Sequence, residues 1–71
     1  MPYVNVQITR EGDTSAQRKA EIIQGISNVL KDVLGKDPKS TFVVIEEVEL
    51  ENWGIGGLPA EAYRQQKSEQ R

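Results

Sequence analysis

YVNVQIT, residues 3–9, is the segment from which the architecture of this chain follows. Its side chains alternate without a break, so that Val4, Val6 and Ile8 share one face and polar or aromatic side chains share the other. Successive side chains of an extended chain point to opposite sides, and an alternating pattern therefore predicts a strand with one dry face. The apolar face of this strand must be covered by another element, and the next segment supplies one.

A long amphipathic helix is predicted directly after this strand. Thr14 and Gln17 have the spacing of a capping box, which places the start of the helix at this point. Gly35 predicts its end, and Pro38 makes continuation unfavourable. Between these signals, apolar residues recur three or four positions apart as one stripe: Ile22, Ile23, Ile26, Val29, Leu30, Val33 and Leu34.

A second strand is predicted over residues 41–48, which are rich in β-branched side chains and nearly continuously apolar up to Ile45. Such a run is typical of a central strand that is buried on both faces. Strand, helix and strand form a βαβ unit with parallel strands and a right-handed crossover, which makes the fold class α+β. Two strands under one helix leave a sheet face and an edge bare, so the sheet must be completed by oligomerisation.

The glycine-dense segment WGIGG, residues 53–57, predicts a tight C-terminal hairpin with positive φ angles. A phosphate-binding loop is the less favoured interpretation, because no clean strand precedes the segment and no long helix follows it. From about residue 60 the tail is polar and charged, and we expect a helical turn over residues 60–66, then frayed or disordered chain. Residues 1–71 are thus expected to form a single domain.

Composition excludes several classes of function. The chain has 71 residues, no histidine, no cysteine and a formal charge of −2. Disulfides and thiolate metal sites are therefore absent, a basic nucleic-acid-binding face is not expected, and no apolar run approaches a membrane span. No signal-peptide pattern occurs at the start, so the cytoplasm is the expected compartment. A domain of this size without disulfides or a structural metal site is expected to be a homo-oligomer.

Pro2 directly follows Met1, and methionine is usually removed before proline. The resulting prolyl amine would be the only group here that titrates naturally near neutral pH, since free α-amino groups have a pKa of about 8. At the start of a strand such an amine is held in one place, which suits a general base next to a carbonyl. The alternative is that Pro2 has no role, as in many proteins that begin with Met-Pro.

Other candidate residues have both a functional and a structural interpretation. Arg10 closes the first strand and is either a carboxylate clamp or a surface arginine. Trp53 is either the wall of an apolar pocket or a packing residue. The acidic side chains of residues 46, 47, 49 and 51 indicate a solvated or interface-rim charge run rather than a metal site, because neighbours in a strand point to opposite faces.

Taken together, these features resemble the 4-oxalocrotonate tautomerase family, whose members carry an amino-terminal proline. The resemblance runs from the Met-Pro start through both strands and the helix to the aromatic-Gly-Ile-Gly-Gly segment at residues 53–57. It implies that βαβ units pair into a four-stranded sheet with two helices, and that such dimers assemble into a hexamer. It also implies that no cofactor or metal takes part.

The resemblance assigns roles residue by residue. Pro2 would be the general base, and Trp53 takes the place of the pocket aromatic. Two family arginines normally hold the substrate, but Asp13 stands where the first is expected, with Arg10 close by, and Phe42 stands where the second is expected. An aromatic or otherwise apolar enol acid, bound by Arg10 and lined by Phe42 and Trp53, therefore fits better than a dicarboxylate.

The expected function is a cofactor-free keto–enol tautomerase acting on an enol or dienol of an unsaturated or aromatic 2-keto acid. Two alternatives remain open. A protonated Pro2 could act as an acid in hydration, dehalogenation or decarboxylation, or the chain could be a non-catalytic or heteromeric assembly subunit.

Overall fold

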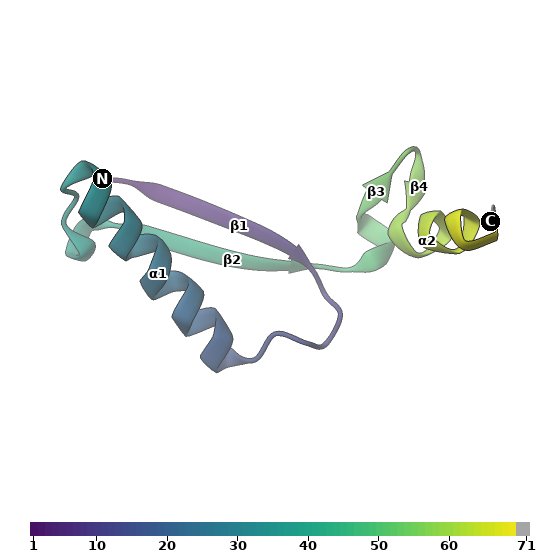
Figure 1. The fold of residues 1–71 in the computed structure, drawn as a ribbon, viewed down its shortest axis with the longest axis horizontal. Coiled ribbons are helices and arrows are strands. Elements are labelled where there is room, and N and C mark those ends of the chain that lie inside the picture. Colours follow the sequence, from purple (N-terminus) through teal and green to yellow (C-terminus); the bar gives the residue numbers. More distant parts are fainter. Residues whose placement is uncertain (70–71) are drawn as a thin grey trace.

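The computed structural model describes residues 1–69 and consists of a βαβ unit followed by a small C-terminal unit (Figure 1). The βαβ unit contains β1 (Tyr3–Thr9), α1 (Ala16–Leu34), the 3-10 turn η1 (Pro38–Ser40) and β2 (Phe42–Val48). The C-terminal unit contains the 3-10 turn η2 (Leu50–Asn52), β3 (Gly54–Ile55), β4 (Leu58–Pro59) and α2 (Ala60–Glu69). The α+β class, the parallel βαβ unit and the C-terminal hairpin are confirmed.

β1 and β2 pair in parallel, with Tyr3 opposite Phe42 and Thr9 opposite Val48. The side chains of β1 alternate as predicted: Val4, Val6 and Ile8 are partly covered, and the intervening residues 3, 5 and 7 are exposed. In Figure 1, α1 crosses the same face of both strands. The dry face of β1 therefore forms the sheet side of the contact with α1.

The start of α1 differs from the predicted capping box. Ser15 is the N-cap, and its hydroxyl accepts a hydrogen bond from the backbone N–H of Arg18 at 3.2 Å. The Thr14 hydroxyl instead donates to Asp13 Oδ1 at 3.2 Å. The capping interaction is thus displaced by one residue, since adjacent hydroxyls compete for the same role. The end of α1 is confirmed, because Gly35 has a φ of 68° and its N–H bonds the Lys31 carbonyl at 2.9 Å.

The C-terminal segment contains the predicted tight hairpin. Gly56 and Gly57 join β3 to β4 with φ angles of 58° and 85°, which side chains with a Cβ rarely adopt. α2 follows and is longer than the helical turn predicted for residues 60–66. Its first residue, Ala60, is fully buried, and Arg64 forms an ion pair with Glu11. Contacts with the rest of the chain therefore stabilise α2, whose own sequence predicts only a short helical turn. Residues 70 and 71 lie outside the described residues.

A single copy of the chain buries little apolar surface. Its radius of gyration is 16.2 Å, whereas a compact domain of this length would have about 11 Å. β2, predicted to be buried on both faces, is covered on one face only, and Phe42 and Val44 are 50% and 41% exposed on the other. Val29, Val33 and Leu34 of α1 are also exposed. The chain by itself leaves open the surfaces that an oligomer would cover.

Candidate functional site

Pro2 lies immediately before β1 and is held there by the neighbouring strand. Its carbonyl oxygen accepts a hydrogen bond from the Phe42 backbone N–H at 2.9 Å, so the sheet ladder begins at Pro2 itself. Pro2 is partly covered, while Met1 is exposed. A proline has no backbone N–H to lose at this position, and its ring fixes φ, so the nitrogen occupies a defined place at the end of the sheet.

The surface beside Pro2 is apolar. Phe42 stands directly across from Tyr3, and both aromatic side chains are exposed on the sheet face opposite α1. Val44 continues this apolar surface two residues farther along β2. The structure therefore brings Pro2 and Phe42 together, as the predicted site requires, beside the exposed side chains of Tyr3 and Val44. Polar groups follow on the same face, where the Asn5 amide donates to the Tyr3 hydroxyl at 3.2 Å and to Glu46 Oε1 at 2.6 Å.

Arg10 lies at the opposite end of β1. It is eight residue steps along an extended chain from Pro2, which corresponds to roughly 26 Å. Its backbone N–H donates to the Val48 carbonyl at 2.8 Å, continuing the ladder past the end of the strand. The guanidinium faces two carboxylates, with Nε 2.7 Å from Glu49 Oε1 and Nη1 3.7 Å from Glu47 Oε2. Within one chain, Arg10 does not reach Pro2.

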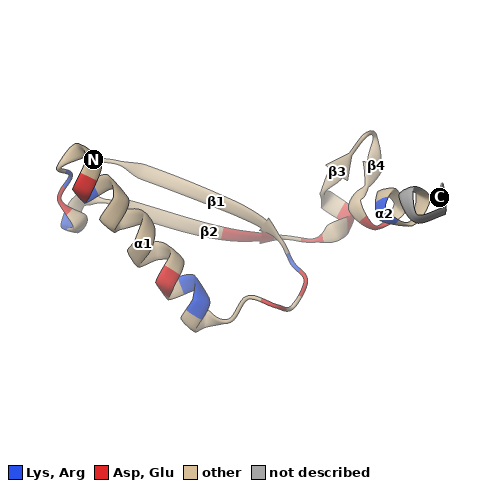
Figure 2. Cartoon of the chain, viewed as in Figure 1, with Lys and Arg blue, Asp and Glu red and all other residues tan. Residues whose placement is uncertain are grey.

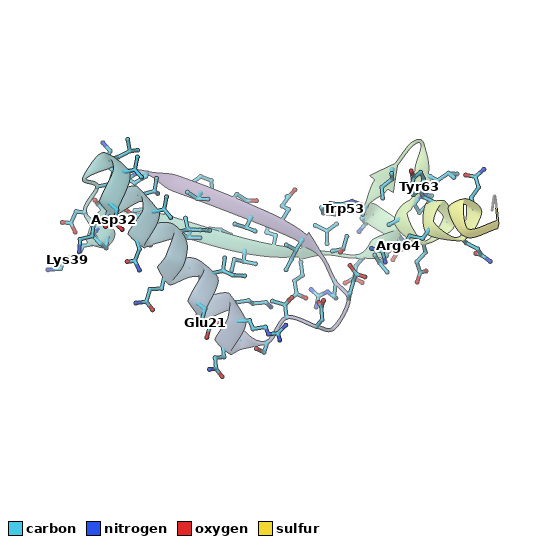
Figure 3. All side chains as sticks on the ribbon, in the orientation of Figure 1. Glu21, Asp32, Lys39, Trp53, Tyr63 and Arg64 are labelled. Carbon is cyan, nitrogen blue, oxygen red and sulfur yellow. The ribbon has the colours of Figure 1, made fainter. Side chains whose placement is uncertain are left out.

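Trp53 also lies beyond the carboxyl end of β2, in the C-terminal unit between η2 and β3 (Figure 3). It follows η2, and its backbone N–H donates to the Leu50 carbonyl at 3.2 Å. Arg64 of α2 holds this unit to the loop after β1, with Nη1 2.9 Å and Nη2 3.4 Å from the two carboxylate oxygens of Glu11. The four candidate residues thus divide into two groups, one at each end of the sheet.

Acidic residues are concentrated at the carboxyl end of β2 (Figure 2). The Lys19 ammonium is the main cause that lowers the pKa of Glu47, through a direct hydrogen bond that outweighs the opposing effect of desolvation. Hydrogen bonds from Arg64 and then Thr9 lower the pKa of Glu11, and the same contact raises the pKa of Arg64. These carboxylates are consequently ionised at neutral pH and engaged by cations of their own chain.

The ion pairs of Arg10 were missed by the sequence interpretation, which treated the acidic residues 46, 47, 49 and 51 as a solvated or interface-rim charge run. The signal was present in the register. If Thr9 pairs with Val48, then Arg10 must lie beside Glu49, and Glu47 falls two residues back on the same side. Among the described residues, no group of three or more His, Cys, Asp and Glu side chains could hold a metal ion. No helix within residues 1–69 has the length and apolar character of a membrane span.

Comparison with protein families and solved structures gives a consistent result. The family model described as "Tautomerase enzyme" matches residues 2–63. The chain is 50% identical over 68 residues to "Probable tautomerase K2" of Dickeya dadantii, covering 96% of this chain and all of that protein. It is 40% identical over 60 residues to the 2-hydroxymuconate tautomerase of Pseudomonas putida, covering 84% and 92% of the two chains.

Among solved structures, the crystal structure of DmpI from Helicobacter pylori superimposes with a TM-score of 0.80 at 32% identity. The superposition covers 90% of this chain and 97% of that one. TomN, described as a 4-oxalocrotonate tautomerase homologue of the tomaymycin biosynthetic pathway, has a TM-score of 0.81 at 23% identity, which shows the shared fold.

Proposed function

This chain belongs to the 4-oxalocrotonate tautomerase family and is an isomerase of that kind, and we propose that it interconverts the enol and keto forms of a 2-keto acid with Pro2 as general base. Removal of Met1 converts the Pro2 nitrogen into a secondary amine. The neutral amine accepts the proton of the enol hydroxyl, and the prolinium then returns a proton to carbon as the carbonyl forms. No redox change or cofactor is needed for this exchange.

The observation that carries this proposal is the position of Pro2. The Phe42 N–H bonds the Pro2 carbonyl at 2.9 Å, so the amine stands at a fixed point beside an exposed aromatic surface. A base that is held rigidly next to bound substrate gains from orientation as well as from its pKa. Apolar surroundings also favour the neutral form of an amine, which is the form that accepts a proton.

The substrate that fits this end of the sheet is an enol with one carboxylate and an apolar or aromatic body. Phe42 offers ring contact but no positive charge for a second carboxylate. Arg10 is the candidate partner for the single carboxylate, and Trp53 is the candidate wall on the other side. Both lie at the far end of the sheet from Pro2, so a neighbouring copy must contribute them to the site.

The test is the ketonisation of phenylenolpyruvate, followed by ultraviolet absorbance. Untagged protein with a mass-verified prolyl N-terminus is compared with the same chain that retains Met1. General base catalysis typically contributes about 10²- to 10⁴-fold, so the methionine-capped form should lose at least two orders of magnitude in kcat/KM. Equal activity of the two forms would exclude Pro2 as the base.

The pH profile distinguishes the proposed base from the alternative in which a protonated Pro2 acts as an acid. For base catalysis, kcat/KM should rise as the amine loses its proton and then level off. For the acid role, activity would fall over the same range. Phenylenolpyruvate ketonisation measured between pH 5 and 9 tests the base role, and any hydration, dehalogenation or decarboxylation activity measured over the same range tests the acid role.

A further inference from the structure

The guanidinium of Arg10 is occupied by carboxylates of its own chain. Glu49 Oε1 lies 2.7 Å from Nε, and Glu47 Oε2 lies 3.7 Å from Nη1. Glu47 is also paired with Lys19 of α1. These four side chains carry two positive and two negative charges, so the only arginine proposed for substrate binding belongs to a group with no net charge.

The pairing of Arg10 with Glu49 follows from the backbone. The hydrogen bond from the Arg10 N–H to the Val48 carbonyl extends the parallel register by one residue and sets Arg10 beside Glu49. The two carboxylates differ in their surroundings. The side chain of Glu47 is only 13% exposed and is shared with Lys19, whereas that of Glu49 is 54% exposed. Glu49 is therefore the carboxylate that an incoming ligand can displace.

A carboxylate binds a guanidinium best through two parallel N–H donors. Glu49 accepts from Nε, and Glu47 lies near Nη1. A substrate carboxylate must therefore displace Glu49, or bind only the N–H donors of the guanidinium that these two carboxylates leave unoccupied. The negative charge of Glu49 also repels it at short range. We propose that Glu49 is a specificity-determining residue that competes with the substrate carboxylate for Arg10 and so raises KM for carboxylate substrates. This inference rests on the proposed role of Arg10 as carboxylate clamp.

The experiment measures kcat and KM for Glu49→Gln, with Glu51→Gln as the matched control. Glu51 is an exposed glutamate two residues farther along the chain and has no part in the ion pairs of the described residues. Two substrates are used, the enol of phenylpyruvate and the enol of its methyl ester, which lacks the charge. We expect Glu49→Gln to lower KM for the acid roughly 3- to 10-fold, as expected for removal of one close like charge.

Four further readouts separate competition from a structural effect. Glu49→Gln should leave kcat for the acid within about twofold, KM for the ester should be unchanged, and Glu51→Gln should match the wild type with both substrates. In the background of Arg10→Ala, the effect of Glu49→Gln should disappear, since there is no guanidinium left to compete for.

The outcomes also separate this inference from the proposed function. If Arg10→Ala raises KM for the acid but Glu49→Gln has no effect or raises KM as well, competition is overturned while Arg10 remains the clamp. If Arg10→Ala leaves KM for the acid unchanged, the proposed role of Arg10 fails and the competition fails with it.

Discussion

The two ends of the β1–β2 sheet differ in chemistry although the same pair of strands builds both. At the Pro2 end, Phe42 and Tyr3 present exposed aromatic surface beside the proposed base. At the other end, Arg10 is paired with Glu47 and Glu49. One end carries the proposed proton acceptor beside aromatic surface, and the other carries the arginine proposed to bind the substrate carboxylate. With the roles proposed for Pro2 and Arg10, each end supplies what the other lacks, and the proposed site therefore combines opposite ends of two copies.

Subunit mixing tests this division with the largest expected effect. One chain carries an N-terminal extension that keeps the Pro2 nitrogen in a peptide bond, and the other carries Arg10→Ala. Each alone should turn over phenylenolpyruvate poorly at substrate concentrations well below KM. After the two are unfolded and refolded together, random assembly should restore about one quarter of the wild-type activity, because that fraction of shared sites has both groups intact.

The control is a mixture of each variant with itself under the same refolding protocol. If the equimolar mixture gives only the average of the two separate activities, Pro2 and Arg10 do not meet in a shared site. That result would contradict the comparison of the two ends directly.

A substitution at the Pro2 end should convert its apolar character into a charged one. Phe42→Arg places a cation next to the proposed base, where the resemblance to the family expects an arginine. A hydrogen bond to a charged group contributes about 1.5–3 kcal/mol, so kcat/KM for a dicarboxylate enol such as 2-hydroxymuconate should rise roughly 10- to 100-fold relative to phenylenolpyruvate.

Val44→Arg is the matched control for this substitution, since Val44 is exposed on the same strand two residues farther from Pro2. Val44→Arg adds the same charge at a greater distance from Pro2. It should therefore change the ratio of kcat/KM for 2-hydroxymuconate to kcat/KM for phenylenolpyruvate less than Phe42→Arg does. Equal effects of the two variants would indicate general electrostatic attraction and not a site beside Pro2. A wild-type enzyme that already strongly prefers the dicarboxylate would contradict the assignment of Phe42.

The sequence predicted the local features of the fold better than the contacts between distant segments, for a physical reason. Alternation along β1, the glycine that ends α1 and the hairpin glycines are local signals, and the structure follows all of them. The ion pairs of Arg10 depend on the register between strands about forty residues apart, which no single segment contains. The position of α2 depends in the same way on a contact between Arg64 and Glu11. The contacts between neighbouring copies involve a second chain, so the sequence pattern of one chain does not specify them.

The smallest expected effect concerns stability at the charged end. The folded-state pKa of Glu47 lies below its usual value of 4.5, chiefly because of Lys19. A group with a lowered pKa stabilises the fold above its unfolded-state pKa, and that stabilisation is lost as pH falls through the folded-state pKa. The melting temperature at fixed protein concentration should therefore decline below about pH 4.5, and Glu47→Gln should flatten this decline.

Lys19→Met tests the cause of this effect separately from the carboxylate itself. Because the hydrogen bond from Lys19 is the largest influence on the pKa of Glu47, this variant should flatten the acid decline much as Glu47→Gln does. Both variants should approach the wild type at low pH, where the carboxylate is protonated in every form, and should lie below it at neutral pH. A decline in Glu47→Gln as steep as in the wild type would assign the acid sensitivity to another group, with Glu11 and its Arg64 contact as the next to examine.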